Sequence, residues 1–211
     1  MQYRDRREAG EKLATALAGY RGQDVVVYAL PRGGVPLGYE VAKALKAPLD
    51  VVIVRKIGHP FQPEWAACAV AEGGRLLCDE GERASLDPAW LKAEVEKEQQ
   101  EAKRRRETYL GEKSHLPASG KVAIVVDDGV ATGLSMLLAV DEVLAQHPTE
   151  LIVAVPVTPR EAAEKIRGRG ATLVALQEPE VYEGAVGAYY EEFPQVEDAQ
   201  VIALLHNRDT P

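Results

Sequence analysis

The most distinctive residues of this sequence are two adjacent aspartates, Asp127 and Asp128, followed by small and hydroxyl-bearing residues at 129–135. Glycines in such a run let the backbone approach a ligand closely, and successive N–H groups can then converge on an anion. Two neighbouring carboxylates can accept hydrogen bonds from a vicinal diol. The pattern therefore predicts one loop that holds the phosphate and the sugar of a single ligand.

This loop differs from the commonest nucleotide-binding loops. It does not end in Gly-Lys-Ser or Gly-Lys-Thr, and it contains no Gly-x-Gly-x-x-Gly. It follows a predicted strand at 121–126 and precedes a predicted helix at 134–146, so a bound anion would lie at a helix N-terminus. The alternative is that Asp127 and Asp128 cap this helix and that the glycines form a tight turn.

Hydrophobic residues followed by Asp-Asp, small residues and Thr-Gly-x-Ser resemble the phosphoribosyl pyrophosphate motif of type I phosphoribosyltransferases. The resemblance spans the predicted strands and loops of residues 24–176. It implies that Asp127 and Asp128 bind the ribose 2′- and 3′-hydroxyls. The residues that it assigns to the 5′-phosphate are Gly129, Val130, Ala131, Thr132, Gly133 and Ser135.

The resemblance does not fix the acceptor. Hypoxanthine-guanine enzymes of this family have an aspartate directly before Thr-Gly, where this chain has Ala131, and the whole chain looks closest to bacterial phosphoribosyltransferases of unassigned acceptor. Residues 181–193 resemble the base-binding hood of the 6-oxopurine enzymes, which implies Tyr182 as the stacking residue and Val186 beside the base. Alternatively, these aromatic residues pack a C-terminal cover onto the core or form the interface of a homodimer.

A second loop, with Pro31, Arg32, Gly33 and Gly34, also lies between a predicted strand and a predicted helix. By the same resemblance it binds pyrophosphate, through the charge of Arg32 and the amides of Gly33 and Gly34. We expect a non-proline cis peptide bond between Pro31 and Arg32, because such bonds persist where a functional site enforces them. The alternative is an ordinary turn that begins a helix.

Two groups of basic residues are further candidates. Arg55 and Lys56 end the predicted strand at 49–54, where they could neutralise pyrophosphate, so the catalytic candidates are Arg32, Arg55 and Lys56. The alternative is that this pair is solvated. For the basic run at 103–106 we expect a solvent face whose charges pair with nearby glutamates at helical spacing.

The elements that must position these residues follow a regular alternation. Short apolar runs predict strands at 24–30, 49–54, 121–126, 150–155 and 171–176, and amphipathic segments between them predict helices. Continuous apolar strands that alternate with helices indicate an α/β fold: an open, mainly parallel twisted sheet with helices on both faces. In such sheets ligands bind at the carboxyl ends of the strands, where the candidate loops lie.

Two regions depart from this alternation. Residues 65–78 predict a hairpin that turns at Gly73-Gly74, and residues 87–110 predict a long charged helix followed by a mobile loop at 111–120. We therefore expect one domain over residues 1–211, with an inserted hairpin and helix forming a hood at about 62–118. A C-terminal cover is expected at about 177–211.

The composition excludes several classes of protein. A net charge of −8 disfavours binding to nucleic acid or to an anionic membrane, and no run of apolar residues is long enough to span a bilayer. With Cys68 and Cys78 as the only cysteines, we expect no disulfide framework and a cytoplasmic location.

The resemblance implies a reaction that uses 5-phosphoribosyl 1-pyrophosphate and Mg²⁺ to phosphoribosylate a nitrogenous base, with release of pyrophosphate. Mg²⁺ would bind mainly to oxygens of the ligand and to water, so we assign no certain metal ligand in the protein. The alternative is a regulatory protein that binds phosphoribosyl pyrophosphate or a nucleotide as a signal. Retention of both Arg32 and the Arg55-Lys56 pair favours the enzyme.

Overall fold

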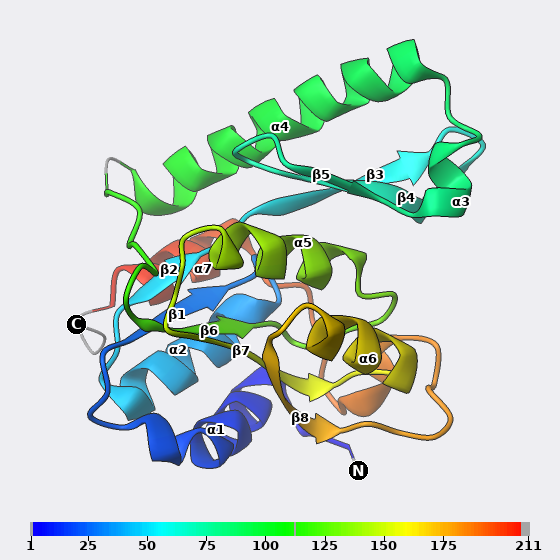
Figure 1. Ribbon diagram of the computed structural model, residues 1–211. Coiled ribbons are helices and arrows are strands. Elements are labelled where there is room, and N and C mark those ends of the chain that lie inside the picture. Colours follow the sequence, from blue (N-terminus) through cyan, green and yellow to red (C-terminus); the bar gives the residue numbers. More distant parts are fainter. Residues whose placement is uncertain (1, 112, 208–211) are drawn as a thin grey trace.

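The core of the protein is a parallel sheet of five strands in the order β2-β1-β6-β7-β8 (Figure 1). The computed structural model describes residues 2–111 and 113–207. All residues of β1 and β6 are buried, as expected for strands covered on both faces. The strands are β1 (Val25–Ala29), β2 (Leu49–Val51), β6 (Val122–Val126), β7 (Glu150–Val157) and β8 (Thr172–Gln177).

Helices cover both faces of this sheet, which confirms the predicted α/β fold class. Alternate strand residues such as Val27 and Ile124 pack with α1 and α2, whereas Val26 and Val125 pack on the opposite face with α5 and α6. Figure 1 shows α1 and α2 below the sheet and α5 above it. The helices are α1 (Arg6–Ala16), α2 (Gly34–Leu45), α5 (Leu134–Leu144) and α6 (Arg160–Gly168).

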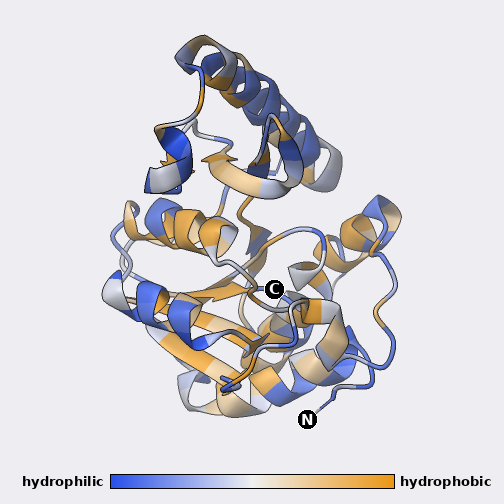
Figure 2. Cartoon of the chain, turned by 90° about the vertical axis from the view of Figure 1, so that its right-hand side faces the viewer, coloured by the Kyte–Doolittle hydropathy of each residue, from blue (hydrophilic) through white to orange (hydrophobic). Residues whose placement is uncertain are grey.

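A second, antiparallel sheet forms the hood above the core (Figure 1). Along β4, Cys68 and Val70 face the long helix α4, while Ala69 and Ala71 face α5, so the hood sheet lies between these two helices. In Figure 2 the helix α4 is mainly hydrophilic, whereas the strands of the core are mainly hydrophobic. The hood consists of β3 (Val54–His59), β4 (Gln62–Ala71), β5 (Leu76–Cys78), α3 (Glu80–Arg83) and α4 (Pro88–Leu110).

The hairpin and the long helix of the insertion are confirmed. Gly74, with φ of +91°, lies in the turn between β4 and β5, and this left-handed backbone favours glycine. Asp87 caps α4 by accepting a hydrogen bond of 2.8 Å from the Trp90 N–H, and Pro88 follows at the first helical position.

The strand predicted at 49–54 is wrong in its second half. β2 ends at Val51, and Val54 begins β3, which pairs antiparallel with β4 through Val54–Ala71 and Arg55–Val70. A continuous apolar run contains no sign of the point where the chain leaves one sheet for another. As a result Arg55 and Lys56 lie near the start of a hood strand and not at the end of a core strand.

The expectation of no disulfide framework is also wrong, because Cys68 and Cys78 form a disulfide. The register of the hairpin places them directly opposite each other on β4 and β5, with their Cα atoms 3.9 Å apart. The number of cysteines in a sequence does not reveal that two of them lie opposite each other on neighbouring strands.

The N-terminal segment pairs with the C-terminal cover beside the core. Tyr3 N–H donates to the Tyr189 carbonyl (2.8 Å) and Glu191 N–H donates to the Tyr3 carbonyl (2.7 Å). The C-terminal cover further includes the 3₁₀ helix η2 (Val186–Tyr189) and α7 (Asp198–Leu205), and α7 packs against α2 and α4. Neither α1 nor α7 was anticipated from the sequence. A second 3₁₀ helix, η1 (Ala18–Tyr20), follows α1.

The loop predicted at 111–120 contains no helix or strand among its described residues. It is fastened to the core, because Leu116 N–H donates to Asp50 Oδ2 (2.8 Å) and Ala118 N–H donates to Gln146 Oε1 (2.9 Å). Its mobility stays a prediction. Residue 112 of this loop and residues 208–211 of the predicted cover lie outside the described residues. No described helix is both long and apolar enough to cross a membrane.

Candidate functional site

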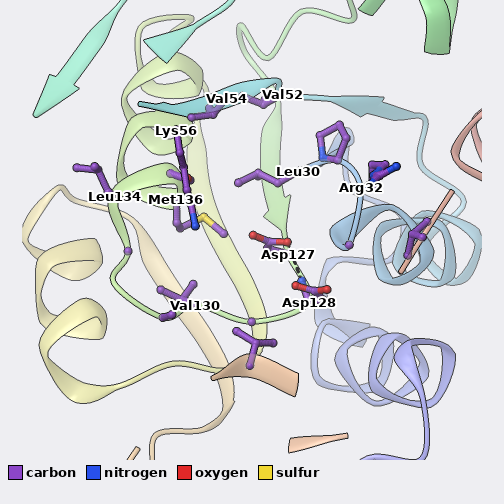
Figure 3. A pocket seen from close by; sticks show the side chains of 18 of the residues that line it. Leu30, Arg32, Val52, Val54, Lys56, Asp127, Asp128, Val130, Leu134 and Met136 are labelled. Atoms are coloured by element: carbon purple, nitrogen blue, oxygen red, sulfur yellow. Dashed lines mark hydrogen bonds between the residues drawn. The ribbon is translucent and has the colours of Figure 1, made fainter. Parts of the chain in front are cut away.

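A cavity of about 690 Å³ opens at the carboxyl ends of β1 and β6, between the core and the hood (Figure 3). Its walls come from the loop after β1, the loop after β6, strand β3 of the hood, the start of α1 and the C-terminal cover. Most of the site residues predicted from the sequence meet here. Those that line the cavity are Arg32, Gly33, Arg55, Lys56, Val186 and the entire run from Asp127 to Ser135.

The loop after β6 carries the features expected of an anion site. Gly133, with φ of +88°, leads directly into α5, whose first N–H groups have no carbonyl partner within the helix. Val130 differs from its neighbours, because its N–H donates to the Val157 carbonyl (2.9 Å) and is not directed at the cavity. Gly129 lies against the C-terminal cover, since a Cβ there would lie 2.6 Å from Val186 Cγ1.

Asp127 and Asp128 form the floor of the cavity (Figure 3). Asp127 Oδ1 accepts a hydrogen bond of 2.9 Å from the Asp128 N–H. Burial, together with the neighbouring charge of Asp128, raises the pKa of Asp127 well above its usual value. Burial also raises the pKa of Asp128, although the guanidinium of Arg6 opposes this rise. Two adjacent carboxylates are thus held in a place where their charge is costly, which is typical of a functional site.

The loop after β1 has the predicted cis peptide bond between Pro31 and Arg32. The two glycines allow this loop to contact the aspartates. A Cβ on Gly33 would lie 2.6 Å from the Asp128 carboxyl carbon, and one on Gly34 would lie 2.9 Å from Asp127 Cα. The Gly34 N–H is already bonded to the Leu30 carbonyl (3.0 Å), so Gly34 is explained by this close approach and its amide is not directed at a ligand.

The basic candidates lie on opposite sides of the aspartates. Arg32 Nη1 is 3.7 Å from Asp198 Oδ1 at the start of α7. Lys56 extends from β3 into the cavity (Figure 3), whereas Arg55 lines the cavity but has its Nε 2.8 Å from Glu98 Oε2 of α4. The structure therefore brings Arg32, Arg55 and Lys56 to one cavity.

The basic run at 103–106 is only partly the solvent face that the sequence predicts. Arg104 is 60% exposed and pairs with Glu101. Arg105 lines the cavity, however, and Arg106 is 16% exposed because it reaches back to the core sheet. Helical spacing could have revealed that Arg106 faces the core. Ala102 and Tyr109 lie on the same face of α4 as Arg106, and both are fully buried.

Of the two base-binding candidates in the C-terminal cover, one lines the cavity and the other does not. Val186 lines the cavity, but Tyr182 does not: its ring stacks on that of Tyr189, with centroids 5.5 Å apart. The aromatic side chain that lines the cavity is Phe193, with Arg6 of α1 directly over its ring. Arg6, Arg105 and Phe193 are among the lining residues that the sequence analysis did not assign to the site. They lie far along the chain from the loops that they adjoin.

Within residues 2–111 and 113–207 no group of three or more His, Cys, Asp or Glu side chains converges to hold a metal ion. The carboxylates that line the cavity are Asp127 and Asp128. The cavity therefore offers two adjacent hard oxygen donors, bordered by basic side chains and by a helix N-terminus.

Comparison with known proteins identifies relatives over nearly the whole chain. Residues 2–192 match a family model described as a phosphoribosyl transferase domain. Two proteins of Mycobacterium tuberculosis, MT0597 of strain CDC 1551 / Oshkosh and Rv0571c of strain H37Rv, are each 42% identical over 203 residues and bear the provisional name of phosphoribosyl transferase. The match covers 95% of this chain but 46% of each relative, so the chain spans about half the length of these relatives.

One solved structure, that of TT1426 from Thermus thermophilus, is similar in both fold and sequence. It superposes with a TM-score of 0.81 at 43% identity, covering 97% of this chain and 98% of the other. Because 97% of this chain is covered, the similarity extends beyond the central sheet to the inserted hood.

Proposed function

This chain belongs to the phosphoribosyl transferase family, and from that premise we propose that it is a transferase for phosphoribose. The donor would be 5-phosphoribosyl 1-pyrophosphate, the acceptor a nitrogenous base, and the leaving group pyrophosphate. The observation that carries this proposal is the position of Asp127 and Asp128. They lie between the N-terminus of α5 on one side and the Pro31–Arg32 loop on the other.

This order of groups matches the order of groups in the donor. The N–H groups at the start of α5 would bind the 5′-phosphate, and the two carboxylates would accept hydrogen bonds from the ribose 2′- and 3′-hydroxyls. Arg32 would then contact the pyrophosphate. Since Arg32 Nη1 is 3.7 Å from Asp198, donor binding would exchange that weak ion pair for one with the pyrophosphate.

The chemistry requires charge stabilisation and no protein nucleophile. Attack on C1′ passes through an oxocarbenium-like state while negative charge develops on the departing pyrophosphate. Arg32 and Lys56 border the cavity from opposite sides and would stabilise that charge. The hood would exclude water from the reacting carbon.

We also propose Mg²⁺ as the cofactor, because adjacent hard oxygen donors beside a polyphosphate suit this ion. It would be held mainly by oxygens of the donor and by water next to the half-buried Asp127 carboxylate, where the negative charges of Asp127 and Asp128 are only partly offset. When bound, it would supply charge stabilisation to the leaving group.

The test is a panel of nucleobases with phosphoribosyl pyrophosphate and Mg²⁺, scored by pyrophosphate release. We expect release with at least one base, and its loss in the Asp127→Asn/Asp128→Asn double variant, which should remain folded. The matched control is Asp24→Asn, an exposed carboxylate that precedes β1 at the opposite end of the strand and pairs with Lys121.

Tight donor binding without turnover on any base would overturn the enzyme and favour a regulatory protein that senses the donor. Unchanged donor affinity in the double variant would contradict the assignment of the diol to Asp127 and Asp128.

A further inference from the structure

Arg6, the first residue of α1, makes several contacts at the edge of the cavity. Its Nε is 2.8 Å from Asp128 Oδ2, its Nη1 donates to the Pro194 carbonyl (2.6 Å), and its Cζ lies 3.7 Å from the centroid of the Phe193 ring. The guanidinium is thus fixed in position and orientation by the C-terminal cover while it holds a carboxylate of the cavity floor.

This ion pair differs from the other pairs of α1 by its burial. The side chains of Arg6 and Asp128 are 11% and 14% exposed, whereas the adjacent Arg7, which pairs with Glu11, is 71% exposed. Surface pairs contribute little, but a largely buried pair holds its partner more firmly because water competes less for the charges. Arg6 therefore restrains Asp128 in a way that Arg7 cannot restrain Glu11.

The remaining contacts of Asp128 leave its carboxylate little freedom. Tyr190 Oη donates to the Asp128 carbonyl (2.7 Å), and the Asp128 N–H is held by Asp127. On the side facing the Pro31–Arg32 loop, Gly33 packs so closely that no side chain would fit. Within this confined space the guanidinium of Arg6 contacts the carboxylate directly.

We propose that Arg6 is a positioning residue for the donor: it orients the Asp128 carboxylate to receive a ribose hydroxyl. This inference rests on the proposed function. It extends the site beyond the local motif, because the start of α1 and the C-terminal cover then complete the ribose subsite. Arg6 acts through Asp128 and need not touch the donor.

The experiment compares Arg6→Gln, Arg6→Lys and the control Arg7→Gln, with donor affinity measured by calorimetry and KM and kcat measured by pyrophosphate release. For Arg6→Gln we expect donor binding at least tenfold weaker, with KM for the donor rising more than kcat falls. Arg6→Lys should restore part of this affinity, because it returns the positive charge without the planar guanidinium. Arg7→Gln should match the wild type.

The outcomes separate this inference from the function on which it rests. Wild-type affinity in Arg6→Gln, or a loss of affinity that Arg6→Lys does not reduce, would overturn the role of Arg6 while leaving the proposed function intact. Tight donor binding by the wild type without turnover would overturn the proposed transferase activity. The donor affinities of the variants would still test whether Arg6 positions Asp128. Absence of donor binding by the wild type would overturn both. If Arg6→Gln does not fold, a donor affinity of Arg6→Lys equal to that of the wild type would overturn the need for a guanidinium.

Discussion

At the scale of single residues, the ionised carboxylate of Asp127 destabilises the protein without its ligand, and donor binding would offset this cost. Burial and the adjacent charge of Asp128 raise its pKa, whereas the Asp128 N–H and the charge of Lys56 oppose this rise only in part. The folded protein therefore binds a proton at Asp127 more tightly than the unfolded chain does. An ionised Asp127 destabilises the empty protein, and the hydroxyls of a bound donor would relieve that cost.

We predict that Asp127→Asn stabilises the empty protein and weakens donor binding. Because the folded-state pKa is raised, the free energy of unfolding of the wild type should fall as pH rises above the unfolded-state pKa of about 3.9, until it passes the folded-state pKa. The asparagine side chain keeps an acceptor for the Asp128 N–H but cannot ionise. The advantage of the variant should therefore grow as the pH rises from the unfolded-state pKa towards the raised folded-state pKa of Asp127.

Urea unfolding at a series of pH values would measure this difference, and donor affinity would be measured in parallel. Parallel pH profiles for variant and wild type would contradict a raised pKa for Asp127.

At the scale of elements, the site depends on how closely two loops approach. The loop after β1 and the loop after β6 belong to neighbouring strands, which pair in register through Ala29 and Val126. Gly33 has φ of −59° and ψ of −36°, so its backbone would suit any residue, and glycine is needed there only because of the Asp128 carboxylate. The second loop therefore limits which residue can occupy the first.

Gly33→Ala should accordingly displace the Asp128 carboxylate without straining the backbone. We expect at least a tenfold loss of donor affinity and a stability loss of about 1–3 kcal/mol, typical of overpacking. Gly19→Ala is the control, since a Cβ at Gly19 would have no neighbour within 4 Å. Calorimetric titration and thermal unfolding of both variants would test this, and equal donor affinity in the two would disprove the proposed contact.

At the scale of the whole molecule, Arg106 joins the hood to the core. From the last turns of α4 it reaches Asp50 Oδ1 (3.3 Å) and the Val51 carbonyl (2.8 Å) at β2, and Glu72 (2.7 Å) beyond the end of β4. Burial alone would raise the pKa of Asp50, but a hydrogen bond with His115 and the charge of Arg106 hold it below its usual value. A largely buried ion pair thus links the hood to the core.

Arg106→Gln should destabilise the protein by about 3 kcal/mol, because removing one partner leaves the buried Asp50 with less compensation. The His115 Nδ1, 2.6 Å from Asp50 Oδ2, remains as a second partner. Arg104→Gln provides the control on the same helix: its exposed pair with Glu101 predicts a change within about 0.5 kcal/mol. Chemical denaturation of both variants would measure the free energy of unfolding. Similar losses of stability in the two variants would contradict the stabilising role of the Arg106–Asp50 pair.

The sequence by itself determined the central sheet and the chemistry of its main loop. Buried parallel strands are continuous apolar runs, so the segments at 24–30, 121–126, 150–155 and 171–176 could be recognised locally. The Asp127–Ser135 loop carries its carboxylates, glycines and helix start within a few residues, so its anion-binding character was readable before the fold was known. The cis peptide bond between Pro31 and Arg32 was also expected, because the short loop that contains it resembles the pyrophosphate loop of the family.

Only the tertiary structure decided which distant residues complete the site. Arg6 and Asp128 are separated by 122 positions in the sequence. Helix α4 of the hood brings Arg105 to the cavity, and strand β3 of the hood sheet brings Arg55 and Lys56. The pairing of Cys68 with Cys78 likewise follows from strand register. Such contacts depend on how the helices and strands pack against one another, and the local periodicity of the sequence does not predict this packing. The loop after β6 could therefore be read from the sequence, whereas the groups that orient its carboxylates could not.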